Sequence, residues 1–263
     1  MICFPSAKIN LGLHVLSKRS DGYHNIETVF YPINLCDALE IVPAVGGKTV
    51  FSQTGIQVEG NPKDNLVLKA YNLLKKDFCL PEVAIYLFKK IPVGAGLGGG
   101  SSDAASMIKM LNEFAELNLS KKKMEEYASQ IGADCPFFIQ NKPVFAEGTG
   151  NIFSPVSISL KDYKIIVKKP SVSVSTKTAY AKVKPQQPAI PLKEIICLPI
   201  NEWKDKLIND FESGIFAQNP EIEALKQQFY TEGAVYASMS GSGSAVFGIF
   251  PKNSRNLPES KAD

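Results

Sequence analysis

The sequence lacks any cysteine pattern typical of a disulfide framework or a zinc site. Its five cysteines are odd in number and widely separated, and none forms a Cys-x-x-Cys pair or has a histidine at ligand spacing. This pattern predicts buried free thiols in a protein that stays in a reducing compartment. The cysteines are Cys3, Cys36, Cys79, Cys135 and Cys197.

Long apolar runs and a strong net charge are also absent. No stretch approaches the ~18 apolar residues of a membrane-spanning helix, and no basic segment of a signal peptide stands at the N-terminus. The formal net charge is only +3, and the lysines form scattered doublets and one triplet without interleaved aromatic residues, a pattern typical of solvated faces. We therefore expect a cytoplasmic protein that binds neither membranes nor nucleic acid, whereas its oligomeric state is not indicated.

Glycine is concentrated in one place. Five of the seven residues from 94 to 100 are glycine, and the apolar positions that follow Ser101 and Ser102 have helical spacing. The strand-like segment 83–88 precedes them. Glycines let a backbone approach a ligand closely, and the free N–H groups and dipole of a helix N-terminus favour an anion. This stretch therefore predicts a phosphate-binding loop.

Two known phosphate loops fit this stretch poorly. A P-loop requires lysine before its final serine or threonine, and Gly99-Gly100-Ser101 has none. A dinucleotide fingerprint is formally present from Gly94 to Gly99, but a second helix, over residues 120–132, follows where that fold requires a parallel strand. A glycine-rich turn without a ligand remains as the structural alternative.

Polar residues at the N-terminus alternate with apolar ones. Residues 7–15 read as a half-buried strand with Lys8 and Asn10 on its polar face, and an Asp-Gly turn follows at residues 21–22. The predicted hairpin would bring Tyr23 and His24 back beside Lys8. A solvent-facing polar edge is the alternative for these residues.

Asp134 stands at the mouth of a short apolar strand predicted over residues 137–139, after a helix that Pro136 prevents from continuing. Spacing alone favours a turn or capping aspartate over a catalytic one.

The remaining elements follow from local patterns. Strands and turns are predicted over residues 38–60, a helix over 65–76, a strand over 163–167 and a connector with little regular structure over 185–199. Helices are predicted over 207–215 and from Pro220 to 229, and the tail 251–263 is polar. Residues 235–250 read as strand, Gly-Ser loop and strand; this loop is either a plain hairpin or a second phosphate-facing backbone nest.

Three separated motifs together resemble one family. They are Ala7-Lys-Ile-Asn-Leu with Asp21-Gly-Tyr-His24, the central stretch from Pro92 to Ala105, and Met239-Ser-Gly-Ser-Gly. These motifs resemble those of the GHMP kinases, small-molecule kinases whose own phosphate loop replaces a P-loop. Gly132-Ala-Asp-Cys-Pro-Phe-Phe138 and Asn209-Asp-Phe-Glu212 fit the same family, and the resemblance covers nearly the whole chain. Ser242 stands where the last motif often has threonine.

The resemblance implies a fold of the α+β class with two domains. Residues 1–155 would form an N-terminal ATP-binding, ribosomal-protein-S5-domain-2-like α/β domain with a left-handed βαβ feature. Residues 156–263 would form a ferredoxin-like C-terminal domain.

The resemblance also implies phosphorylation, by ATP with Mg²⁺, of a hydroxyl of 4-diphosphocytidyl-2-C-methyl-D-erythritol in the non-mevalonate isoprenoid pathway. Another GHMP kinase activity, a dinucleotide-dependent oxidoreductase and a catalytically silent nucleotide-binding module are the alternatives.

Residue roles carry over on the matching motifs. Asp134 is implied as the base that takes the hydroxyl proton, and Lys8 as its cationic partner. The metal ligands are not identified, and Ser102 is only a candidate. The substrate-binding residues implied are Asn10, Tyr23, His24 and Tyr180. The ATP-binding residues implied are Pro92, Val93, Gly94, Ala95, Gly96, Leu97, Gly98, Gly99, Gly100, Ser101 and Ser102.

Overall fold

The structure is a computed structural model that describes residues 1–58 and 60–253, so most of the predicted polar tail lies outside the described residues. The chain forms two compact units, neither of which is a continuous segment. The predicted domain boundary between residues 155 and 156 divides the chain into two continuous segments, and it stays a prediction. Unit 1 comprises Met1–Lys8, Pro32–Val93 and Gly98–Lys142, and unit 2 comprises Ile9–Tyr31, Gly94–Leu97 and the described residues from Pro143 onward.

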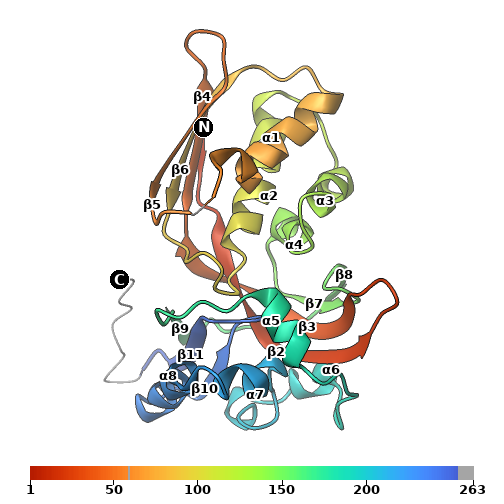
Figure 1. Cartoon of the computed structure of the whole chain (residues 1–263), viewed down its shortest axis with the longest axis vertical. Coiled ribbons are helices and arrows are strands. Elements are labelled where there is room, and N and C mark those ends of the chain that lie inside the picture. The colour runs from red at the N-terminus through yellow and green to blue at the C-terminus, as the bar shows by residue number, and fades with distance from the viewer. Residues whose placement is uncertain (59, 254–263) are drawn as a thin grey trace. The chain divides into compact units, whose positions relative to one another are not determined.

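Unit 1 contains a four-stranded sheet with one face covered by helices α1 (Leu66–Asp77) and α2 (Gly99–Phe114) (Figure 1). The predicted helix over 65–76 and strand over 83–88 are confirmed. Strands β5 and β6 pair in parallel around α1, so a βαβ unit is present, and its left-handed crossing stays a prediction. The sheet order is β1 (Ile2–Cys3), β4 (Ala38–Pro43), β6 (Val83–Lys89) and β5 (Val50–Gly55), and the 3₁₀ helix η1 (Pro62–Asp64) precedes α1.

Two further helices complete unit 1, and one of them corrects the sequence prediction. Helix α3 (Lys121–Ser129) begins after Ser120, whose hydroxyl accepts a hydrogen bond from the Lys123 N–H. The predicted strand over 137–139 is wrong, because these residues lie in helix α4 (Cys135–Gln140). Pro136 falls in the first turn of this helix, where its missing N–H costs nothing and its fixed φ suits a helix start.

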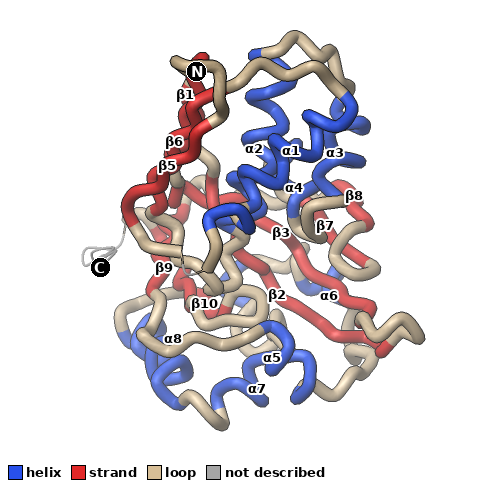
Figure 2. Tube along the Cα trace, turned by 45° about the horizontal axis from the view of Figure 1, so that its top comes forward, coloured by secondary structure: helices blue, strands red, loops and turns tan. Residues whose placement is uncertain are grey.

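A long hairpin, β2 and β3, forms one half of a second four-stranded sheet, ordered β2-β3-β7-β8 (Figure 2). The predicted turn is confirmed, since Asp21 accepts a hydrogen bond from the Tyr23 N–H. The turn places His24 beside Lys18, at the end of β2. The prediction that Tyr23 and His24 return beside Lys8 is therefore wrong, because Lys8 lies near the other end of this strand. The strands are β2 (Ser6–Lys18), β3 (His24–Cys36), β7 (Val144–Glu147) and β8 (Ile152–Pro155).

Strand β2 is buried on both faces, which corrects the half-buried strand of the prediction. Lys8, Asn10 and His14 are only 2 to 3% exposed. At Gly12, whose φ is +66°, a Cβ atom would lie 2.6 Å from the Leu207 side chain. Alternation of polar and apolar residues indicates a strand, but side chains far away in the sequence decide whether its polar face meets water.

The remaining elements of unit 2 form a three-stranded antiparallel sheet and its helices. Strand β9 (Tyr163–Lys168) pairs with β11 (Val246–Pro251), and β11 pairs with β10 (Tyr236–Met239), so the predicted strand-loop-strand is confirmed. The helices are α5 (Thr176–Lys182), α6 (Leu192–Ile195), η2 (Ile200–Glu202), α7 (Phe211–Phe216) and α8 (Pro220–Thr231).

One helix prediction in unit 2 requires correction, and one helix was not foreseen. The helix predicted over 207–215 starts only at Phe211, because the backbone around it bonds to β2: Leu13 donates to the Ile208 carbonyl and accepts from the Asp210 N–H. Helix α5 was not predicted from the sequence. The helix starting at Pro220 is confirmed.

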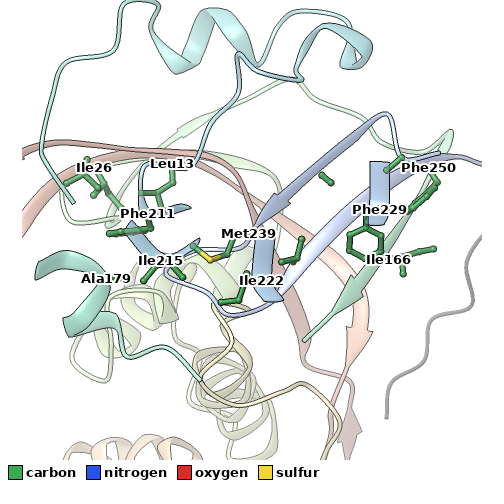
Figure 3. Close-up of a cluster of buried hydrophobic side chains, with 14 residues drawn as sticks. Leu13, Ile26, Ile166, Ala179, Phe211, Ile215, Ile222, Phe229, Met239 and Phe250 are labelled. Carbon is green, nitrogen blue, oxygen red and sulfur yellow. The ribbon is translucent and has the colours of Figure 1, made fainter. Parts of the chain in front are cut away.

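The core of unit 2 joins the hairpin to the second half of the chain. Leu13 and Ile26 from β2 and β3 belong to the same buried cluster as Phe211 and Ile215 of α7 (Figure 3). Its other labelled members are Ile166, Ala179, Ile222, Phe229, Met239 and Phe250.

All five cysteines are free, but the prediction that they are buried is correct only for Cys135. Cys79 and Cys197 are exposed, and Cys3 and Cys36 are half-buried. A thiol is small enough to stand at the surface at little cost, so the lack of pairing did not determine burial. Within residues 1–58 and 60–253, no helix has the length and apolar character needed to cross a membrane.

Candidate active site

Unit 1 brings Lys8 and Asp134 together. The Lys8 Nζ lies 3.6 Å from Asp134 Oδ2, and the Asp134 side chain is 36% exposed while that of Lys8 is buried. Asp134 occupies the position before α4, yet its side chain makes no capping hydrogen bond. The capping role that spacing favoured is therefore not the one this geometry shows, and the carboxylate stays accessible to a substrate.

Burial determines the acidity of Lys8. Loss of solvation lowers the pKa of Lys8, and the neighbouring Asp134 carboxylate raises it only in part. An ammonium group in this position is a positive charge with little screening by water. It can offset negative charge on a phosphoryl group more strongly than a surface lysine could.

The first part of the central glycine loop is held by the second glycine loop. Within unit 2, Ser240 Oγ donates to the Gly96 carbonyl over 2.9 Å, and the Ala245 N–H donates to the Ala95 carbonyl over 3.2 Å. Gly96 has a φ of +77°, and a Cβ atom there would lie 1.9 Å from the Ser240 carbonyl oxygen. Glycine is therefore required at residue 96 for two reasons: the backbone is in the left-handed region, and the Ser240 carbonyl leaves no room for a Cβ atom.

The last part of the loop opens helix α2. The helix begins at Gly99, two residues before the predicted start, and Gly98 precedes it in the left-handed region with a φ of +70°. No side chain caps this helix N-terminus. Its first-turn N–H groups, including that of the exposed Gly100, are thus suited to an anion. This local backbone is compatible with the predicted phosphate loop, which stays a prediction.

A buried ion-pair cluster lies in unit 1 just before this loop. Lys89, at the end of β6, contacts the carboxylates of Asp37 and Asp103, and all three side chains are buried. Burial raises the pKa of Asp103 to about 7. Scattered lysine doublets predict solvated faces, and for Lys89 this prediction is wrong, because its side chain is only 3% exposed. The one feature of the sequence that could have pointed to a role for Lys89 near the loop is its position three residues before Pro92.

The predicted substrate residues are brought together only in part. The rings of His24 and Tyr180 stack with centroids 4.8 Å apart and planes inclined by 24°, and Tyr180 also meets the edge of Phe211. Burial and the nearby Lys18 lower the pKa of His24, so its imidazole is neutral at pH 7. Tyr23 lies outside this stack and is 67% exposed.

Asn10 is buried beside the second glycine loop. Its amide donates to Thr28 Oγ1 over 3.0 Å, and a Cβ atom on Gly241 would lie 3.3 Å from Asn10 Oδ1. The same loop is held from the other side by Asn209, whose amide donates to the Met239 and Gly241 carbonyls. The Asn209-Asp-Phe-Glu motif thus supports the loop that supports Gly96.

The family model for the GHMP kinases N terminal domain matches residues 65–142, and that for GHMP kinases C terminal matches residues 199–259. A protein of Bacteroides fragilis is 58% identical over 252 residues, which is 95% of this chain and 92% of the relative. The chain belongs to the GHMP kinase family. It is therefore a kinase, a phosphotransferase, and the alternative of a dinucleotide-dependent oxidoreductase is wrong.

Two relatives similar over nearly the whole chain share one name. The Bacteroides fragilis protein is named 4-diphosphocytidyl-2-C-methyl-D-erythritol kinase, as is a Cytophaga hutchinsonii protein that is 51% identical over 95% of this chain and 92% of its own length. A solved 4-(cytidine 5'-diphospho)-2C-methyl-D-erythritol kinase superposes with a TM-score of 0.79 at 31% identity, over 95% of this chain and 90% of that one. A mevalonate kinase of Methanococcus jannaschii, 16% identical over 96% of this chain and 91% of its own, has a TM-score of 0.69 and shares the fold. The predicted two-domain GHMP kinase fold is confirmed.

Proposed function

We propose that this kinase transfers the γ-phosphate of ATP to a hydroxyl of 4-diphosphocytidyl-2-C-methyl-D-erythritol, a step of the non-mevalonate isoprenoid pathway. The observation that carries the chemistry is the Lys8–Asp134 pair, an accessible carboxylate beside a buried cation. The choice of alcohol rests on the shared name of relatives that match nearly the whole chain.

In this proposal Asp134 is the general base. It accepts the proton as the substrate oxygen forms its bond to the γ-phosphorus, and the bond from that phosphorus to the bridging oxygen breaks to release ADP. Lys8 pairs with the Asp134 carboxylate and offsets charge on the phosphoryl group in transfer. The transfer itself requires mostly alignment and electrostatic stabilisation.

ATP is assigned to the loop from Pro92 to Ser102. Its phosphates would meet the uncapped first turn of α2. Mg²⁺ is expected to arrive with the nucleotide, because this ion is usually held by substrate phosphates and one or two protein ligands. Ser102 remains the candidate protein ligand, and when bound the ion would neutralise phosphate charge.

The cytosine ring is assigned to the aromatic residues of unit 2. His24 and Tyr180 already form a stacked pair, which offers a flat surface, and a neutral imidazole can both donate and accept a hydrogen bond. Tyr23, exposed at the turn, has its ring available to a ligand. Asn10 is proposed as a further substrate-binding residue, from its place beside the second glycine loop.

An ADP-release assay with a panel of alcohols tests the proposal. The panel contains the cytidine-diphosphate alcohol together with mevalonate and homoserine, the substrates named for the family's structural relatives. We expect ADP release to rise far above the ATP-only rate with the cytidine compound alone, and to be lost in Asp134→Asn. Faster release with mevalonate or homoserine would assign another GHMP kinase activity. ATP binding without turnover of any alcohol would indicate a silent nucleotide-binding module.

A further inference from the structure

Lys89 holds a buried position that the proposed chemistry does not use. Its side chain is 3% exposed, and its ammonium group contacts Asp37 Oδ2 and, over 2.7 Å, Asp103 Oδ2. The Asp37 and Asp103 side chains are equally buried. The three residues come from three places in unit 1: Asp37 directly precedes β4, Lys89 ends β6 and Asp103 lies in the second turn of α2.

Asp37 fixes the backbone that leads into the phosphate loop. While its Oδ2 contacts Lys89, its Oδ1 accepts hydrogen bonds from the N–H groups of Lys90 (2.6 Å) and Ile91 (2.8 Å). The next residue is Pro92, the first of the loop. The entrance to the loop is therefore tied to the Lys89 ammonium group through one carboxylate.

Asp103 links the helix that leaves the loop to Lys89, because its carboxylate accepts from the ammonium group over 2.7 Å one turn beyond the start of α2. That start rests directly on the entrance: a Cβ atom on Gly99 would lie 2.8 Å from Ile91 Cγ2 and 3.3 Å from Lys89 Nζ. Residues 94–97 belong to unit 2, so the chain leaves unit 1 and returns to it between the two tethered ends.

The cluster is poorly suited to stability alone. A buried lysine with two carboxylates loses solvation on all three groups, and apolar side chains of similar volume are often as stable or more so. Asp103 Oδ1 is buried and has no hydrogen-bond partner among the residues that the structure describes, which adds a further cost. Such an arrangement is better explained by the geometry that it imposes on the loop.

We propose that Lys89 is a positioning residue for ATP: through Asp37 and Asp103 it fixes both ends of the phosphate loop and so orients the first turn of α2 toward a nucleotide triphosphate. The inference rests on the proposed assignment of ATP to this loop. Lys89 acts through the backbone and does not itself contact the nucleotide.

Substitutions at Asp103 test this role with a matched pair. Asp103→Asn keeps an oxygen that can accept from Lys89, whereas Asp103→Ala removes the tether, and Lys90→Met changes the neighbouring exposed lysine as a control. ATP dissociation constants are measured by calorimetry on the full chain without alcohol, followed by kcat and both KM values. We expect Asp103→Ala to raise the Kd and KM for ATP about tenfold, equivalent to ~1.4 kcal/mol. Asp103→Asn and Lys90→Met are expected to stay within about twofold of wild type, with kcat and the alcohol KM unchanged in all three variants.

Each other result overturns the inference. Wild-type ATP affinity in Asp103→Ala would show that the tether does not position the loop, and equal losses in Asp103→Ala and Asp103→Asn would show that the hydrogen bond is not what matters. A joint fall in kcat and rise in both KM values would indicate a general structural role. A wild-type protein that binds no ATP would overturn the loop assignment and this inference together, whereas intact wild-type binding with an unaffected Asp103→Ala variant overturns the inference alone.

Discussion

Gly96→Ala tests how closely the two glycine loops must approach. Alanine would have to keep the left-handed φ of +77°, at a cost of ~1 to 2 kcal/mol. Its Cβ atom would also lie 1.9 Å from the Ser240 carbonyl oxygen, which would have to retreat by about 1.5 Å to reach an ordinary contact of 3.4 Å.

That retreat removes contacts that the structure shows. The Ser240 hydroxyl bond to Gly96 and the Ala245 N–H bond to Ala95 would both be lost, at a net ~0.5 to 1.5 kcal/mol each. Together with the backbone strain, the loss in free energy of unfolding is ~2 to 5 kcal/mol.

Gly94→Ala provides the matched control. Gly94 also has a positive φ, +63°, but no atom lies within 4 Å of where its Cβ would stand, so only the backbone strain of ~1 to 2 kcal/mol is expected. Urea unfolding gives both free energies, and calorimetry gives the ATP affinity of each folded variant. Equal destabilisation by the two substitutions would refute the reasoning, because it would show that close approach at Gly96 adds nothing to the cost of the backbone conformation.

Asp134→Asn should lower kcat by roughly 10² to 10⁴ with the ATP Kd unchanged, as measured by ADP release and calorimetry; near-normal turnover would remove Asp134 from the role of base. Burial lowers the pKa of Lys8, so Lys8 should lose its positive charge at a pH below the ordinary lysine pKa of ~10.4. Activity should fall over the same alkaline range. Lys8→Met, already slow, should lack this alkaline fall, and a variant that keeps it would contradict the assignment. His24→Ala and Tyr180→Ala should each raise the KM for the cytidine substrate by the equivalent of roughly 1 to 3 kcal/mol and leave that for ATP unchanged; the reverse pattern would place the cytidine pocket elsewhere.

Local signals in the sequence predicted the elements that are stabilised locally. Asn65 caps α1 through its own side chain, Asp21 closes the hairpin turn, and the glycine run ends at the start of α2. These features depend on residues that are neighbours in the chain, so spacing and turn chemistry are enough to find them.

The errors share a different cause. Leu207 and Ile208 have helical spacing, yet backbone bonding to Leu13, nearly two hundred residues earlier in the chain, holds this segment out of α7. The sequence pattern predicts a surface charge at Lys89, because its partners Asp37 and Asp103 are not its neighbours in the chain. Burial and pairing between distant segments are decided by the whole fold, and a single sequence carries little trace of them.

The mixed origin of the unit 2 core limits how this enzyme could be recombined. Leu13, Val15 and Ile26 pack among Phe211 and its neighbours, so a gene fragment encoding residues 156–263 alone would leave Phe211 and its apolar neighbours without these partners and facing water. A chimaera that exchanges the C-terminal half between two family members would pair one parent's hairpin with the other's helices. Only parents whose side chains match at these positions should give folded hybrids, so natural and laboratory exchange alike should favour inheritance of the hairpin together with the second half of the chain.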